Sequence, residues 1–254
     1  MHKFSLEGKR ALVTGGGTGL GRAIAIEFAK FGADVVLNYN SSKKNAEEVV
    51  EIIKSLGRNA IAIQADVTNE QQVINLINNA VEFGDGKIDV LVNNAGNIFE
   101  SVPVSEMDVS LWQKTMDVNM TSIFLVCKYV IPVMKRQNRG RIINMSSVAA
   151  HNGGGIGTIP YAASKAAVQA FSKGLAKELA PNILVNCIAP GVIDTRIHQA
   201  YISEEARVNN LQRIPLKREG KPEEIAGAAI LLASEYGSYI TGEMIEVNGG
   251  IYMD

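Results

Sequence analysis

The chain has 254 residues, a formal net charge of −1 at pH 7 and 46% hydrophobic residues. These values fit one large α/β domain and exclude a disordered chain. The near-zero charge gives no general attraction to nucleic acid or to a membrane surface, so we expect neither as a partner. The amino-terminal segment has no apolar signal core, and Cys127 and Cys187 are isolated in apolar surroundings. We therefore expect a reducing cytoplasm and no metal site.

β-rich runs alternate along the chain with segments of helical period. Strands are predicted at 10–14, 34–38, 60–64, 90–93, 141–145, 184–189 and 244–247. Helices are predicted at 19–31, after a cap at Ser42, from about 69, and at 106–134, 160–180 and 222–233. Apolar strands joined by helices indicate a mainly parallel sheet covered on both faces. We therefore predict a seven-stranded, doubly wound Rossmann-type fold, with residues 1–254 as a single domain.

A glycine-rich turn follows the first predicted strand and opens the first helix. In the run Thr14 to Gly21, Gly15 allows a tight turn and Gly19 lets the backbone approach a phosphate. Gly21 allows the helix to pack closely on the sheet. The free N–H groups and positive dipole at the start of the helix then favour a pyrophosphate. A merely flexible turn is the alternative, and the strand-to-helix context argues against it.

The spacing of this turn, Thr-Gly-x-x-x-Gly-x-Gly, resembles that of the short-chain dehydrogenase/reductase family. Further motifs of that family follow in order along the chain: Asp66-Val67, Asn93-Asn94-Ala95-Gly96, Asn119, Ser147, Tyr161 with Lys165, and Pro190 to Thr195. The resemblance implies a nicotinamide cofactor. It would be held by Gly15, Thr18, Gly19, Leu20, Gly21, Asn40, Ser41, Ser42, Asp66, Val67, Asn94, Ala95, Gly96, Tyr161, Lys165, Pro190, Gly191, Ile193 and Thr195.

Tyr161 and Lys165 lie one helical turn apart, so both side chains share a face. Free tyrosine has a pKa of about 10, and we expect the Lys165 ammonium, with help from the positive nicotinamide of the cofactor, to lower the pKa of Tyr161 by roughly three. Tyr161 is then the predicted acid and base at a carbonyl or alcohol, with Ser147 holding the same oxygen. The resemblance implies that Lys165 also binds the nicotinamide ribose, and that Asn119 orients a water in a proton relay.

The same spacing occurs a second time, in Tyr39 and Lys43, so the pattern alone proves little. We interpret Tyr39 as packing near the adenine and Lys43 as a solvated helix lysine. Between them, Asn40, Ser41 and Ser42 offer amide and hydroxyl donors where an NAD-selective site would carry a carboxylate.

NADP(H) is therefore the expected cofactor. NAD(H) is the alternative, because Thr18 stands where many NADP-using relatives have a basic residue. Asp66 has two readings that the sequence leaves open. It accepts from the adenine amino group, or it caps the turn before the next helix.

The segment 239–253 resembles the carboxyl terminus of 3-oxoacyl-[acyl-carrier-protein] reductases, with bacterial sugar dehydrogenases a close second. Lys135, Arg136 and Arg139 could form a basic rim for an acidic carrier protein, while 178–184 has no arginine and weakens that reading. We predict a thioester carbonyl substrate, with a sugar or other small alcohol as the alternative.

Four further expectations complete this reading. A non-catalytic NADP-binding sensor is the remote alternative to an enzyme. His151 is interpreted as a solvated or substrate-lining loop residue rather than a base, and 196–218 is predicted to form a substrate lid. The family resemblance implies a homotetramer.

Overall fold

A seven-stranded sheet forms the centre of the protein, in the order β3-β2-β1-β4-β5-β6-β7. The computed structural model describes residues 3–195 and 211–253. The strands are β1 (Arg10–Val13), β2 (Asp34–Tyr39), β3 (Ala60–Gln64), β4 (Val90–Asn93), β5 (Gly140–Met145), β6 (Ile183–Pro190) and β7 (Met244–Val247). Every neighbouring pair is parallel. The prediction of a mainly parallel sheet is confirmed, and all seven strands run parallel.

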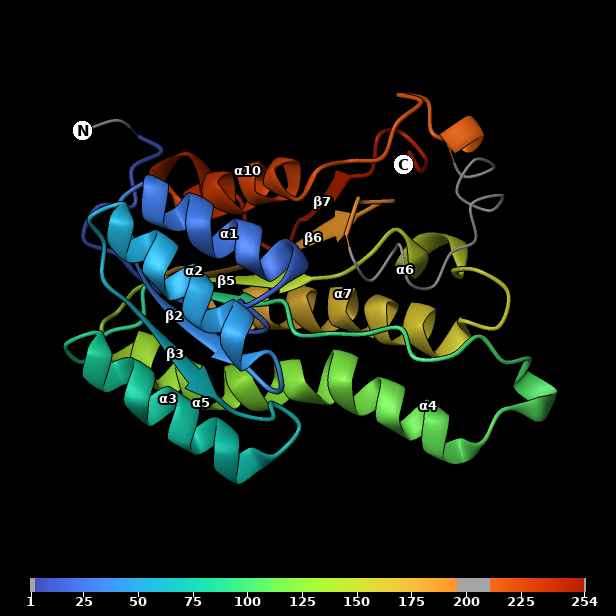
Figure 1. Cartoon of the computed structure of the whole chain (residues 1–254), viewed down its shortest axis with the longest axis horizontal. Coiled ribbons are helices and arrows are strands. Elements are labelled where there is room, and N and C mark those ends of the chain that lie inside the picture. Colours follow the sequence, from blue (N-terminus) through green and yellow to red (C-terminus); the bar gives the residue numbers. More distant parts are fainter. Residues whose placement is uncertain (1–2, 196–210, 254) are drawn as a thin grey trace.

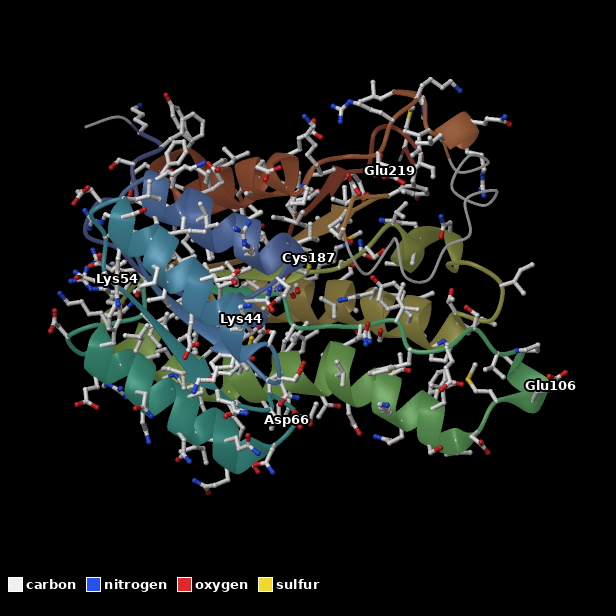
Figure 2. The ribbon with its side chains drawn as sticks, viewed as in Figure 1. Lys44, Lys54, Asp66, Glu106, Cys187 and Glu219 are labelled. Atoms are coloured by element: carbon white, nitrogen blue, oxygen red, sulfur yellow. The ribbon has the colours of Figure 1, made fainter. Side chains whose placement is uncertain are left out.

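Helices cover both faces of this sheet, as Figure 1 shows. One layer contains α1 (Gly19–Lys30), α2 (Lys43–Ser55) and α10 (Pro222–Ala233). The other contains α3 (Glu70–Phe83), α4 (Val109–Met116), α5 (Ser122–Arg136) and α7 (Ile159–Leu179). Each layer has its own buried apolar core against the sheet. Cys187, labelled in Figure 2, is buried in one core with Cys127, so both behave as small apolar side chains.

The helix predicted at 106–134 differs from the observed one. A 3₁₀ turn, η1 (Val104–Glu106), comes first, and α4 begins only at Val109. The helical run then passes through a π-helical segment, η2 (Asp117–Thr121), before continuing as α5. This run, Val109–Arg136, is long and apolar enough to cross a membrane by length and composition. The α5 part of this run buries an apolar face against both α3 and the sheet, as core helices of soluble proteins do.

Several boundaries agree with the sequence prediction, including those of β3, β4, β7 and α10. Two short elements were not predicted: α6 (Ala149–Asn152) and η3 (Glu235–Gly237). Ser42 stands at the cap position of α2, but its side chain makes no capping hydrogen bond. The helix boundary was therefore predicted correctly and the role of the hydroxyl was not.

The strand order reverses at β1, which has β2 on one side and β4 on the other. The connection after β3 crosses to the opposite half of the sheet, so the loops after β1 and β4 diverge. In open parallel sheets this switch point leaves a crevice at the carboxyl ends of the strands, where ligands bind. The glycine turn and the Asn94–Gly96 loop both lie there, at the ends of β1 and β4.

Candidate active site

The glycine turn joins β1 to α1 at the switch point. Gly15 and Gly19 have φ values of +62° and +53°, which are strained for any residue with a side chain. The cap position of α1 is Thr18, which makes no side-chain capping bond, and the first turn contains no acidic residue. The amides at this helix start are therefore left to an external anion.

The loop after β4 is fastened to this turn by side-chain hydrogen bonds. Asn94 Nδ2 donates to the carbonyls of Thr14 and Gly15 at 2.9 and 3.2 Å. Thr14 Oγ1 accepts from the backbone N–H groups of Asn94 and Ala95 at 2.9 and 3.0 Å. A Cβ atom on Gly21 would lie 2.5 Å from Asn94 Nδ2 and would also collide with the Gly15 carbonyl. The structure thus gives Gly21 the packing role that its spacing predicts.

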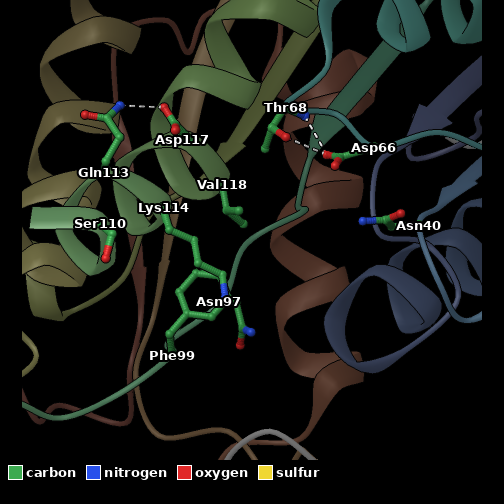
Figure 3. Close-up of a pocket in the computed structure, with 10 residues that line it drawn as sticks. All are labelled: Asn40, Asp66, Thr68, Asn97, Phe99, Ser110, Gln113, Lys114, Asp117 and Val118. Atoms are coloured by element: carbon green, nitrogen blue, oxygen red, sulfur yellow. Dashed lines mark hydrogen bonds between the residues drawn. The ribbon is translucent and has the colours of Figure 1, made fainter. Parts of the chain in front are cut away.

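A cleft of about 630 Å³ opens at the ends of β2 and β3. It is lined by Asn40, Asp66, Thr68, Asn97, Phe99, Ser110, Gln113, Lys114, Asp117 and Val118, as Figure 3 shows. Asn40 and Asp66 come from the predicted cofactor set, and the cleft lies where the adenine is expected. Lys114, whose Nζ is 4.3 Å from the centroid of the Phe99 ring, was not singled out from the sequence. Nor was Val118, although it directly precedes Asn119.

Asp66 takes part in the turn before α3. Its Oδ1 accepts from the backbone N–H and the hydroxyl of Thr68 at 2.9 and 2.7 Å. The cap of α3 itself is Asn69, whose side chain accepts from the Gln72 N–H at 3.1 Å. The interpretation that Asp66 caps the turn before α3 is therefore confirmed for one of its carboxylate oxygens. The helix itself is capped by Asn69. The adenine contact stays a prediction.

The second Tyr-x-x-x-Lys copy straddles the end of β2 and the start of α2. Tyr39 is buried in the strand, whereas the Lys43 side chain is 70% exposed and lies 3.8 Å from the Glu47 carboxylate. Lys43 is thus the solvated lysine that the sequence analysis predicts. Asn38, which that analysis missed, accepts from the Gly15 N–H at 3.3 Å and donates to the Ala65 carbonyl at 2.9 Å. It ties the glycine turn to the loop after β3.

Ser147 and Tyr161 meet at the carboxyl edge of β5. The Ser147 hydroxyl is near enough to the Tyr161 phenol to act on its pKa, and Ser147 Oγ accepts from the Ala149 N–H at 3.2 Å. The neighbouring Ser146 is buried, and its hydroxyl donates to the Lys165 carbonyl at 3.0 Å. Ser146 therefore anchors α7 to β5, and Ser147 is the serine that faces Tyr161.

Lys165 lies beneath Tyr161 and is only 4% exposed. Its Nζ donates to the Met145 carbonyl at 2.8 Å and is 5.6 Å from the centroid of the Tyr161 ring. Burial lowers the pKa of Lys165 to about 8. Burial also raises the pKa of Tyr161, and the nearby Ser147 offsets this only in part. Lys165 by itself therefore does not lower the pKa of Tyr161, because the phenol is desolvated and the ammonium is directed at a carbonyl.

Asn119 lies in the π-helical segment, fully buried. Its Nδ2 donates to the carbonyls of Asn97 and Thr115 at 2.8 and 2.9 Å, and its Oδ1 accepts from the Asn97 N–H at 3.0 Å. A Cβ on Gly96 would lie 2.7 Å from Asn119 Oδ1 and 3.3 Å from Lys165 Nζ. Asn119 Oδ1 and Lys165 Nζ thus both pack against Gly96, where a side chain would collide with Asn119.

The loop after β6 closes the site from the other side. The Pro190 carbonyl accepts from the Val148 N–H at 3.0 Å, which joins this loop to the residue after Ser147. Gly191 packs so closely on Asn248 that an added Cβ would lie 2.7 Å from the Asn248 Cα. Ile193 is buried and pairs with Gly220, and Thr195 is the last described residue before the gap. Of the predicted lid, Arg196, His198, Tyr201 and Arg207 lie outside the described residues.

Two other sequence interpretations change. His151 lies in α6 rather than in a loop, and its side chain is only 13% exposed because it contacts Glu246, so it is not solvated. Arg139 precedes β5 and pairs with Asp89 at 3.0 Å. Lys135 and Arg136 end α5, which runs antiparallel to the strands, so all three basic residues lie at the edge of the sheet opposite Ser147. They do not form a basic rim at the site.

The fold and this site define an NAD(P)-dependent oxidoreductase that acts on CH–OH and C=O groups. A family model described as enoyl-(acyl carrier protein) reductase matches residues 15–252, and the chain belongs to the short-chain dehydrogenase/reductase family. The resemblance seen in the sequence motifs is therefore confirmed.

Three comparisons place the chain within this family. It is 40% identical over 251 residues to 3-oxoacyl-[acyl-carrier-protein] reductase FabG of Aquifex aeolicus, covering 98% of this chain and 100% of that protein. It is 41% identical over 249 residues to glucose 1-dehydrogenase 2 of Bacillus subtilis, covering 97% and 95%. A solved 7α-hydroxysteroid dehydrogenase, complexed with NADH and 7-oxo glycochenodeoxycholic acid, has a TM-score of 0.93 at 37% identity, covering 98% of this chain and 96% of that one.

Proposed function

We propose that this protein is an NADP(H)-dependent reductase of 3-oxoacyl thioesters, resembling 3-oxoacyl-[acyl-carrier-protein] reductases. The observation that carries the proposal is the meeting of Ser147 and Tyr161 at one site, with the Nζ of the buried Lys165 5.6 Å from the centroid of the tyrosine ring. We assign Asn119, Ser147, Tyr161 and Lys165 to catalysis. Because all seven strands join one sheet, we also propose that residues 1–254 act as one domain.

In the proposed mechanism Tyr161 acts as the general acid. Its raised pKa keeps the phenol protonated at neutral pH, so the resting side chain is ready to give a proton to a carbonyl oxygen. The bound nicotinamide supplies the hydride for this reaction. Ser147 donates a hydrogen bond to the same oxygen as negative charge develops on it. For alcohol oxidation Tyr161 must first lose its proton, and we expect this direction to be favoured at high pH.

We propose that Lys165 has two tasks. It holds the nicotinamide ribose hydroxyls, and it relays a proton towards Tyr161. Its pKa of about 8 allows it to pass a proton near neutral pH. We assign to Asn119 the orientation of a water between Lys165 and solvent, which the packing of both side chains against Gly96 supports.

The cofactor preference is argued from the starts of α1 and α2. Neither helix has a side-chain cap or an acidic residue in its first turn, so both offer N–H groups to phosphates. Asn40, Ser41 and Ser42 would hold the 2′-phosphate of NADP(H), and no carboxylate stands there to repel it. Comparing kcat/KM for NADPH and NADH tests this. A strong preference for NADH would contradict it.

The thioester substrate is favoured by the surface before Tyr161. Ile156 is 96% exposed and Ile159 46%, in the segment that leads into the catalytic tyrosine. The backbone of Gly157 bonds to Val102, which brings Val104, 62% exposed, into the same pair of loops. An apolar rim of this kind suits an acyl chain better than a polyol. The positions of Lys135, Arg136 and Arg139 leave the acyl carrier protein itself as the weaker part of the proposal.

A sugar or other small-alcohol dehydrogenase is the second candidate, favoured by the 41% identity to glucose 1-dehydrogenase 2. The decisive experiment measures NADPH oxidation with acetoacetyl-CoA beside NADP reduction with a panel of sugars. Turnover of the thioester alone supports the first proposal, and turnover of a sugar alone supports the second. Cofactor binding without any turnover, with unchanged biological activity in Tyr161→Phe, would favour the remote alternative of a non-catalytic sensor.

We further propose a homotetramer in the cytoplasm, without nucleic acid or membrane as a partner. Val109, Trp112 and Phe124 are 81%, 41% and 46% exposed along α4 and α5, which supports self-association through this helical run. Light scattering coupled to size-exclusion chromatography measures the oligomeric state. A monomeric mass would contradict the proposal.

A further inference from the structure

The short helix α6 (Ala149–Asn152) begins two residues after Ser147. Its first N–H, from Ala149, donates to Ser147 Oγ at 3.2 Å. An isolated helix of one turn is unstable in water, and Gly153, with φ +80°, ends this one at once. The geometry of Ser147 therefore depends on the tertiary contacts that hold α6 in place.

His151 supplies the polar contact between α6 and the far end of the chain. Its Nε2 lies 2.8 Å from Glu246 Oε1, on β7. Its ring stacks on Tyr252 at a centroid distance of 4.2 Å and an interplanar angle of 12°. The two paired side chains are only 13% and 19% exposed, so solvent weakens this contact less than it weakens a surface pair.

The segment that receives His151 is itself held firmly. Glu246 Oε2 accepts from Asn248 Nδ2 at 3.0 Å, so both carboxylate oxygens are engaged. The same Asn248 amide donates to the Tyr252 carbonyl at 3.0 Å, and its Oδ1 accepts from the Gly250 N–H at 2.8 Å. α6 is thus fastened to a closed turn rather than to a loose chain end.

We propose that His151 is a positioning residue for the reaction, acting through Ser147 and not on the substrate. This inference rests on the proposed function and deepens it. Because the Ser147 hydroxyl accepts from the Ala149 N–H and faces Tyr161, a shift of α6 moves this hydroxyl relative to the catalytic acid. The contact between His151, Glu246 and Tyr252 sets that geometry from 95 residues along the chain.

Kinetics of NADPH oxidation with acetoacetyl-CoA test this role. We expect His151→Ala to lower kcat roughly tenfold, as a misplaced catalytic group does, and to leave the KM for NADPH unchanged. His151→Gln should recover most of the loss, because an amide N–H can still donate to Glu246. The matched control is Asn152→Ala on the same helix, whose exposed side chain bonds only to the Gly154 N–H and should leave kcat unchanged.

A double variant separates positioning from direct catalysis. If His151 acts through Ser147, His151→Ala causes no further loss in a Ser147→Ala background. Equal losses in both backgrounds would overturn the proposal, as would an unchanged kcat in His151→Ala alone. Should His151→Ala fail to fold, Tyr252→Leu removes the stacking partner of His151 instead. Its kcat is then measured in the wild-type and Ser147→Ala backgrounds.

A second measurement keeps this inference separate from the proposed function. If the wild-type protein does not reduce acetoacetyl-CoA, the proposed reductase function is contradicted. Hydrogen exchange then tests separately whether His151 anchors α6. The amides of residues 149–153 all donate to Ser147, to Val148 or to Ala149. Exchange at these amides should quicken at least tenfold in His151→Ala and not in Asn152→Ala. Unchanged exchange would overturn the anchoring role.

Discussion

The two Tyr-x-x-x-Lys segments have the same spacing and opposite surroundings. Tyr161 and Lys165 share one helix, and Lys165 is 4% exposed. Tyr39 ends a strand, and Lys43 begins a helix with its side chain 70% exposed. Only the first pair places a buried cation close to a phenol ring. The comparison shows that the spacing alone does not make a Tyr-x-x-x-Lys segment suitable for catalysis. Both residues must lie on one helix, and the lysine must be buried.

The largest expected difference between the pairs is in turnover. Tyr161→Phe removes the proton donor and should lower kcat roughly a thousandfold, within the range for general acids. Tyr39→Phe keeps the ring and should alter only the KM for NADPH. Both are measured as NADPH oxidation with acetoacetyl-CoA, with fluorescence titration to confirm that Tyr161→Phe still binds NADPH. A similar fall in kcat for both variants would break the comparison.

Lys165→Met should abolish most activity and raise stability at pH 7. The pKa of Lys165 falls from 10.5 to about 8 on folding, which corresponds to a destabilisation of up to about 3 kcal/mol. Below pH 8 both folded and unfolded chains carry the proton, so the penalty is complete. Between pH 8 and 10.5 the folded chain releases its proton first, and the penalty fades.

Thermal unfolding measured at several pH values checks the direction in which this destabilisation changes with pH. The gain in Tm from Lys165→Met should be largest below pH 8 and should decline towards pH 10.5. The matched variant Lys43→Met removes a surface cation and should change stability by no more than about 0.5 kcal/mol at any pH. A gain that grows with pH would contradict the buried-cation account.

Of the two Tyr-x-x-x-Lys segments, we expect the one at Tyr39–Lys43 to govern the preference for NADPH or NADH. Asn40→Asp places a carboxylate where it can accept from a ribose 2′-hydroxyl and repel a 2′-phosphate. We expect the ratio of kcat/KM for NADPH over NADH to fall roughly tenfold, or about 1.4 kcal/mol. Asn78→Asp makes the same charge change on an exposed site of α3 and serves as the control. An unchanged ratio in Asn40→Asp would remove the segment from the cofactor site.

The smallest expected effect concerns Ser42. Its side chain does not cap α2, so Ser42→Ala should change the free energy of unfolding by only a few tenths of a kcal/mol. Asn69→Ala removes the observed cap of α3 and should cost about 1 kcal/mol. Urea unfolding measures both, and NADPH titration should show weaker binding in Ser42→Ala alone. Equal destabilisation would mean that Ser42 serves the helix rather than a phosphate.

Most of the fold could be predicted because its signals are local. Apolar runs such as 90–93 and 244–247 indicated strands, and the glycine turn indicated the start of α1. The prediction was wrong where neighbouring elements decide the outcome. The π-helical segment at Asn119 belongs to a continuous apolar helical pattern, and α6 is too short to have a period of its own.

The sequence by itself determined which side chains are available: a glycine turn after β1, a tyrosine and lysine one helical turn apart, and a serine at the end of β5. Only the tertiary structure decided that Ser146 anchors α7 while Ser147 faces Tyr161. It also decided that burial raises the pKa of Tyr161 and that His151 meets Glu246. The reason is physical. Spacing and periodicity are properties of neighbours in the chain, whereas desolvation and contacts between distant segments exist only once the layers have packed.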